Sequence, residues 1–190
     1  MINYPNKKKV DQKKEVINAA NRGMDFEHAI NISNSFYDEE GRAIITKRPT
    51  PIHIVKVDYT KMRIVDAYFE KQSTTDYNGV YRSRYIDFEC KETKSTTSFT
   101  FRNIYLHQIK HLQKVLKHGG IAFFLIYFKS LDEIYLVDAN IIISLFLSSE
   151  KHSISIKELR EKGYLVSQGY NPRVNYLDVV DEVYFHEKNL

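Results

Sequence analysis

Cysteine, tryptophan and long hydrophobic runs are scarce in this sequence. Its 190 residues include one cysteine, Cys90, and no tryptophan. A single cysteine excludes an intrachain disulfide and a cysteine-rich zinc site, and fits a reducing compartment. The longest apolar run, Ile121–Phe128, is far too short to span a membrane, and no apolar segment after the first lysines resembles a secretory signal. We therefore expect a cytoplasmic protein with no membrane association.

The sequence motifs of several enzyme classes are also missing. Gly119-Gly120 lacks the Lys-Ser/Thr pair that follows a phosphate-binding loop, and no Gly-x-Ser-x-Gly elbow of a serine hydrolase occurs. His107 and His111 have the spacing of a zinc protease, but no glutamate follows His107. We interpret these histidines as surface or phosphate-contacting residues.

Positive charge is gathered into two segments. The net charge of the chain is +4. Residues 1–14 hold five lysines and one aspartate, and residues 41–63 hold six basic residues and one aspartate, so the remainder is net negative. This distribution favours a phosphate-binding surface, although a solvated tail explains residues 1–14 equally well. We expect residues 1–14 to be a flexible basic arm and residues 15–190 to be a single domain.

Hydrophobic periodicity predicts helices that alternate with strands. Helices are expected over residues 20–38, 102–118, 141–147 and 156–162, and strands over residues 84–91, 121–128 and 134–137. Residues 73–79 form a turn-rich stretch, and residues 163–190 give no clear pattern. The order is typical of an α/β or α+β fold around one mixed sheet.

Residues 50–70 have an extended character of their own. Apolar residues alternate around Ile54 and again around Val65, with an apparent turn at residues 59–62. Pro49 and Pro51 precede this segment and exclude it from the centre of a sheet. We expect a basic two-stranded ribbon that projects from the core.

The strand at residues 84–91 carries the most informative side chains. Because side chains alternate along a strand, Cys90 faces the core, whereas Glu89 and Lys91 share the other face, roughly 7 Å apart. A carboxylate can hold Mg²⁺, and a lysine can orient water or offset charge on a phosphate. Asp76, in the preceding turn, could supply a second carboxylate. This pattern suits phosphodiester hydrolysis.

A simple salt bridge between Glu89 and Lys91 explains the same spacing. Glu92 and Lys94 repeat it downstream, but alternation sends them to the opposite side. Two predicted helices favour a functional site over a simple salt bridge. Each places one polar side chain, Glu27 or Gln108, on its apolar face. Either residue alone is more simply a hydrogen-bonded buried polar group. Polar groups that converge from several elements are what a metal site requires.

Several motifs, taken together and in order, resemble one known family. They are Asn21-Arg22-Gly23-Met24 with Glu27, Lys47-Arg48-Pro49-Thr50-Pro51, Ser73-Thr74-Thr75-Asp76-Tyr77-Asn78-Gly79, the stretch from Arg84 to Thr93, and His107-Gln108. This set closely resembles the RecU family of Holliday junction resolvases, from about Asn21 to the C-terminus. Cys90 stands where the family usually has alanine.

The resemblance implies a restriction-endonuclease-like fold, an α/β architecture with a mixed sheet flanked by helices and a protruding stalk. It implies a homodimer that resolves four-way DNA junctions by paired symmetric nicks during recombination and repair. Mg²⁺ is the implied cofactor, for which Mn²⁺ can substitute, and the strand-exchange recombinase is an implied partner. A nuclease of the same fold acting on other DNA, and a non-catalytic junction-binding or recombinase-modulating protein, remain alternatives.

The resemblance also carries residue roles. Four positions match the metal-binding set of the family: Thr74, Asp76, Glu89 and Gln108. Lys91 matches the lysine that stabilises the transition state, and Glu27 joins the catalytic group. The ribbon at about residues 50–70 matches the stalk. The residues expected to contact DNA are Arg22, Lys56, Lys61 and Arg63.

Overall fold

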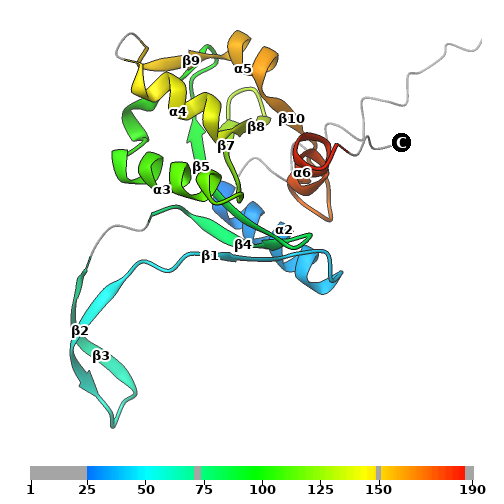
Figure 1. Ribbon diagram of the computed structural model, residues 1–190. Helices are drawn as coiled ribbons and strands as arrows, with labels where there is room; N and C mark the ends of the chain where they lie inside the picture. Colours follow the sequence, from blue (N-terminus) through cyan, green and yellow to red (C-terminus); the bar gives the residue numbers. More distant parts are fainter. Residues whose placement is uncertain (1–24, 71–73, 149–150, 187–190) are drawn as a thin grey trace, which may run out of the picture.

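A helix-flanked sheet forms the body of the protein, and a long two-stranded ribbon projects from it (Figure 1). This computed structural model describes residues 25–70, 74–148 and 151–186. Arg22 and the predicted arm at residues 1–14 lie outside the described residues. The elements are α2 (Phe26–Glu39), β1 (Ile44–Lys47), β2 (Ile52–Asp58), β3 (Arg63–Phe69), β4 (Tyr77–Tyr81), β5 (Arg84–Thr93), β6 (Ser98–Thr100), the 3₁₀ helix η1 (Phe101–Asn103), α3 (Leu106–Lys117), β7 (Ile121–Phe128), β8 (Glu133–Asp138), α4 (Ala139–Leu147), β9 (Ser153–Ser155), α5 (Ile156–Lys162), β10 (Tyr164–Val166) and α6 (Tyr176–Tyr184).

The central sheet is mixed, as predicted. Its strand order is β1-β4-β5-β7-β8-β10. β5 and β7 are parallel and are connected through α3, whereas the other neighbours are antiparallel. One core packs α2 and α6 on one face of the sheet, and a second packs α3, α4 and α5 on the other. β7 is buried on both faces, which explains its unbroken apolar sequence.

Side chains of β5 alternate as the sequence predicts. Phe88 and Cys90 are buried in the core beneath α2 and α6. Asp87 and Glu89 are equally buried but point to the face that α3 covers, where Glu89 reaches Gln108 of that helix. The sheet therefore presents acidic side chains to a helix rather than to open solvent.

The ribbon consists of β2 and β3, which pair only with each other. All of β3 and most of β2 are exposed to solvent, and Figure 1 shows the ribbon reaching well away from the body. Met62 at its turn has a φ of 48°. The predicted projection is thus confirmed.

The sequence does not predict β1 and β4, the first two strands of the sheet order. It predicts a turn at Asn78 and Gly79, but these residues lie inside β4. Gly79 is required there because a Cβ would lie 2.0 Å from the carbonyl oxygen of Ile44 in β1. The turn between β4 and β5 is instead at Arg82 and Ser83, both with positive φ.

Other boundaries also differ from the prediction. The first described helix, α2, begins at Phe26, after Asp25 in an extended conformation, and the predicted start at Ala20 lies outside the described residues. The helix expected from residue 102 begins at Leu106, because a 3₁₀ turn and two extended residues come first. The unassigned C-terminal region contains β10, which completes the sheet, and α6. None of the described helices combines the length and apolarity needed to cross a membrane.

Candidate active site

Three neighbouring elements bring the predicted catalytic residues together on the α3 face of the sheet. Glu89 and Lys91 come from the middle of β5. Asp76 directly precedes β4, one residue beyond the pairing of Tyr77 with Phe88, so it lies alongside Glu89. Gln108 is in the first turn of α3, with its side chain buried. The antiparallel pairing of β4 with β5 therefore creates the acidic pair.

Asp76 is fixed through both its side chain and its backbone. Its Oδ2 accepts the backbone N–H of Cys90 at 2.9 Å, and its carbonyl oxygen accepts the N–H of Arg48 at 2.7 Å. Burial raises the pKa of the Asp76 carboxyl, and the hydrogen bond from Cys90 opposes this effect. The loop before β4 thus holds a carboxylate in a position that disfavours its negative charge.

Glu89 is a buried carboxylate at the centre of the site. Its side chain is 1% exposed. Its Oε1 accepts Nε2 of Gln108 at 2.5 Å and Nζ of Lys91 at 2.6 Å. Burial and the charge of Asp76 together raise the pKa of Glu89 to about 7, against the opposing effects of Lys91 and Gln108. A nearby cation would stabilise the ionised form.

Two buried oxygens in this site lack hydrogen-bond partners among the described residues. They are Oε2 of Glu89 and Oγ1 of Thr74. Buried polar atoms are nearly always satisfied, so two unsatisfied oxygens beside Asp76 fit a hard cation that binds oxygen ligands. In the part of the chain that is described, no three His, Cys, Asp or Glu side chains form a metal-binding group. Any ion here would therefore combine two carboxylates with neutral oxygens.

Gln108 supports the carboxylate pair but is not oriented as a metal ligand. Its Nε2 faces Glu89, while its Oε1 accepts the backbone N–H of Tyr105 at 3.0 Å. The same contact closes a capping box at the start of α3. In this arrangement Gln108 positions Glu89 and anchors the helix.

Glu27 departs from the sequence interpretation. It does not lie on the buried stripe of α2, which Phe26, Ile30 and Tyr37 help to form. Its side chain is 43% exposed and pairs with Lys47 of β1. Its charge contributes to raising the pKa of Asp76, so Glu27 lies at the rim of the site.

The downstream pair behaves as predicted. Glu92 binds Lys129 at 2.7 Å rather than Lys91 or Lys94, and both Glu92 and Lys94 are exposed. The alternation along β5 therefore separates one buried ion pair from a surface pair of similar sequence.

Asp87 forms a polar cluster that the sequence analysis missed. Its side chain is 0% exposed. Oδ2 lies 2.8 Å from Nη2 of Arg48, Oη of Tyr85 and Nε2 of His111, and Oδ1 accepts Oγ1 of Thr75 at 2.5 Å. His111 is therefore held by Asp87 rather than lying free on the surface. The one available signal was the position of Asp87 on the same strand face as Glu89; its partners come from separate segments.

The residues expected to contact DNA lie elsewhere. Lys56, Lys61 and Arg63 are on the ribbon, away from the carboxylate pair (Figure 1). Arg63 lies 4.0 Å from Asp58, a loose surface pair. The structure thus separates the candidate active site in the body from the ribbon that carries these three basic residues.

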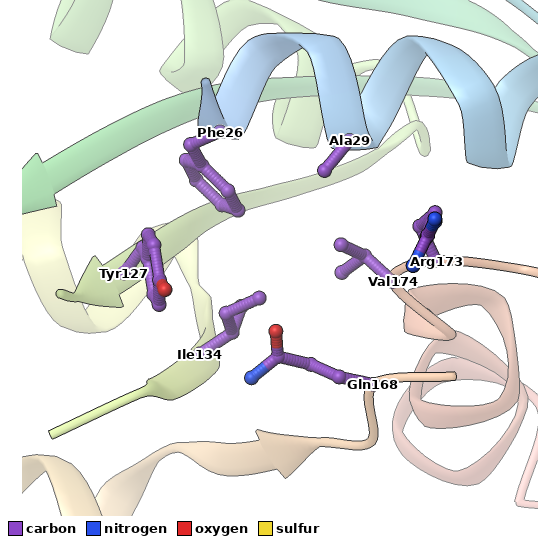
Figure 2. Close-up of a pocket in the computed structure, with 7 residues that line it drawn as sticks. All are labelled: Phe26, Ala29, Tyr127, Ile134, Gln168, Arg173 and Val174. Carbon is purple, nitrogen blue, oxygen red and sulfur yellow. The ribbon is translucent and has the colours of Figure 1, made fainter. Parts of the chain in front are cut away.

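A hollow between α2 and the C-terminal segment is not a competing site. Figure 2 shows its lining of Phe26, Ala29, Tyr127, Ile134, Gln168, Arg173 and Val174. Its volume is about 20 Å³, which leaves room for about one water molecule. This hollow therefore offers no alternative to the cluster around Glu89.

Comparisons with known proteins found a family model and several relatives that match most of this chain. A sequence model described as Recombination protein U (RecU) matches residues 21–182. A protein of Geobacillus sp. (strain WCH70), named Holliday junction resolvase RecU, is 49% identical over 174 residues, which cover 88% of this chain and 87% of the relative. Relatives of the same name from Streptococcus gordonii and Bacillus mycoides are 46% and 45% identical and cover 96% and 97% of this chain, and 96% and 98% of their own.

One solved structure is also similar at low identity. It is Hjc from Archaeoglobus fulgidus, described as a Holliday junction resolvase from an archaeal hyperthermophile. The match has 10% identity and a TM-score of 0.39, and it covers 72% of this chain and 94% of Hjc.

Proposed function

Because the chain belongs to the RecU family of recombination proteins, we propose that it is a metal-dependent endonuclease that resolves four-way DNA junctions. The observation that carries this proposal is the pairing of the half-buried Asp76 with the buried Glu89, with unsatisfied oxygens on Glu89 and Thr74. The names of the relatives support the substrate. The restriction-endonuclease-like fold, a homodimer, a cytoplasmic location and an interaction with the strand-exchange recombinase belong to the same proposal.

Asp76, Glu89 and Thr74 would hold Mg²⁺, or Mn²⁺ in its place, through oxygen ligands. When bound, the ion would offset charge on the attacked phosphate and assist deprotonation of the attacking water. Gln108 is proposed as a further ligand through its amide oxygen, which would have to leave the N–H of Tyr105. In its present orientation it keeps the Glu89 carboxylate directed into the site.

Lys91 has the position expected of a group that stabilises charge on the phosphate. Its side chain is 16% exposed, and Nζ lies 2.6 Å from Oε1 of Glu89. The Glu89 carboxylate holds this ammonium group at the edge of the acidic pair, where an incoming phosphate oxygen can reach it. Removal of such a donor from a desolvated site lowers rates on the order of 10²-fold or more.

The ribbon supports junction selectivity. A straight duplex presents its phosphates along one continuous surface, whereas phosphates from four arms surround the centre of a junction. A narrow projection that carries Lys56, Lys61 and Arg63 can approach several of them at once only in the second case. In a homodimer, two ribbons about one two-fold axis would match the symmetry of the junction, and two active sites would make paired nicks.

Cleavage of labelled four-way junctions and linear duplexes, with Mg²⁺ or with EDTA, tests this proposal. We expect Mg²⁺-dependent cutting of the junction alone. Asp76→Ala and Glu89→Ala should abolish cutting while junction binding stays nearly intact, because phosphate contacts come mostly from lysine and arginine. Cutting by either variant at the wild-type rate would contradict the assignment. Binding without cutting by the wild-type protein would favour a non-catalytic junction-binding or recombinase-modulating protein.

A further inference from the structure

We propose that Arg48 binds the phosphodiester next to the one that is cut, and that Asp87 holds Arg48 in position for this contact. The inference rests on the proposed nuclease function. It assigns a second phosphate-binding position beside the catalytic centre, separate from the ribbon.

The position of Arg48 is set by a buried carboxylate. Nη2 of Arg48 lies 2.8 Å from Oδ2 of Asp87 and 3.2 Å from Oη of Tyr85. Asp87 itself is fully buried and is also engaged by His111 and Thr75. A carboxylate with so many donors cannot easily turn away, so the guanidinium is held in one orientation.

Arg48 keeps donors that the protein does not use. A guanidinium carries five N–H donors. Among the described residues, only Nη2 contacts other side chains, whereas the buried Nε and Nη1 have no hydrogen-bond partner there. The side chain is 25% exposed. A preorganised, partly exposed guanidinium with unused donors suits a phosphate oxygen, because little conformational entropy is lost on binding.

Arg48 lies at about the distance of one DNA phosphate from the expected position of the scissile phosphate. Asp87 and Glu89 are two residues apart on one face of β5, which corresponds to roughly 7 Å. Adjacent phosphates of one DNA strand have a comparable spacing. The backbone N–H of Arg48 also bonds to the carbonyl oxygen of Asp76. A DNA strand with one phosphate at Glu89 would therefore bring a neighbouring phosphate to Arg48.

The pairing with Asp87 also determines how the loss of Arg48 should affect DNA binding and cutting. Because the carboxylate offsets the charge of Arg48, this arginine contributes little to long-range attraction of DNA. Its contribution is a directed, charge-assisted hydrogen bond at short range. The loss of Arg48 should therefore slow cutting more than it weakens overall junction binding.

A protein–DNA double-mutant cycle tests the contact. Junctions are prepared with a neutral methylphosphonate at either phosphate flanking the scissile one, and single-turnover cutting is measured with wild-type protein and Arg48→Gln. At one flanking position, we expect each single change to slow cutting by about tenfold and the combination to be no slower than either alone. If the two losses multiply at both positions, or if Arg48→Gln cuts normally, the proposal is wrong.

Two further variants separate contact from structure. Arg160→Gln is the matched control, because Arg160 also pairs with a carboxylate, Glu133 at 2.9 Å, but on α5. It should keep full sensitivity to the methylphosphonate. Asp87→Asn retains Arg48 but loses its ionic support, so it should lose most of that sensitivity while its urea-unfolding midpoint confirms folding. Full sensitivity in Asp87→Asn would refute the positioning role.

A binding version of the cycle keeps the inference independent of catalysis. Junction affinity is measured with Ca²⁺ in place of Mg²⁺ for the same proteins and junctions. If the wild-type protein binds junctions without ever cutting them, the proposed nuclease function fails. The cycle in binding still decides: non-additive losses between Arg48→Gln and one methylphosphonate support the contact, and additive losses refute it.

Discussion

Replacement of Glu89 by glutamine should stabilise the metal-free protein at pH 8 and leave its stability at pH 5 nearly unchanged. Burial raises the pKa of Glu89 from 4.5 to about 7. Above pH 7 the wild-type fold must therefore contain a buried carboxylate, whereas glutamine keeps the shape and the acceptor without the charge. The variant isolates the free energy that the active site loses by ionising Glu89.

The direction and size of this stability difference follow from the pKa values of Glu89 in the unfolded and folded states. Between pH 4.5 and about 7 the folded state keeps a proton that the unfolded chain releases, so wild-type stability falls as pH rises through this window. Each pKa unit corresponds to about 1.4 kcal/mol, which gives an upper limit of about 3 kcal/mol at pH 8. Lys91 loses its ionic partner in the variant, so a gain of about 1–3 kcal/mol is expected.

Urea unfolding in EDTA at pH 5 and pH 8, at equal protein concentration, measures this difference. Glu92→Gln is the matched control, because Glu92 lies on the same strand but pairs with Lys129 at the surface. It should show no comparable gain. Excess Mg²⁺ should stabilise wild-type protein at pH 8 and have much less effect on Glu89→Gln. Equal effects of Glu89→Gln at both pH values, or a loss of stability at pH 8, would refute the reasoning.

Two other substitutions and one deletion test separate parts of the structure. Lys91→Ala should slow junction cutting on the order of 10²-fold, whereas Lys94→Ala, on the other side of β5, should be nearly silent in the same assay; equal losses would mean a wrong register. Gly79→Ala should lower the urea midpoint substantially, since its Cβ would collide with the β1 backbone; an unchanged midpoint would show that β1 can move away. Deletion of residues 56–63 should weaken junction binding far more than duplex binding in gel-shift titrations over a range of salt. Each lost phosphate contact should lower the salt slope by roughly one unit, and equal losses on both substrates would indicate only a general electrostatic role.

Strand β5 was predictable because its signals are local. Alternation along β5 is a property of neighbouring residues, and it correctly separated Glu89 and Lys91 from Cys90. The unbroken apolar sequence of β7 similarly gave its bounds. The burial of Gln108 followed from helical periodicity and needed no knowledge of its partner.

Features that depend on distant pairing were not predictable in the same way. β1 is a short edge strand and β4 is its short neighbour, and the close approach at Gly79 is set by a segment 35 residues earlier in the chain. The Asp87 cluster gathers Arg48, Thr75 and His111 from separate segments. Periodicity placed Asp87 on the correct face, but no local pattern could say which donors would meet it.

Long-range contacts also connect the base of the ribbon to the candidate active site. A two-stranded ribbon has little stability of its own, so its orientation depends on its base. On one side of that base, Arg48 bonds to the carbonyl oxygen of Asp76 through its backbone and to Asp87 through its side chain. On the other side, the chain leads from Phe69 to Thr74 and Asp76 within a few residues. The segment that leads into the ribbon is therefore hydrogen-bonded to Asp76, a proposed metal ligand. We expect DNA that engages the ribbon to restrain Asp76 through this bond, so that selectivity for a branch point can act on the position of Asp76 without a separate recognition domain.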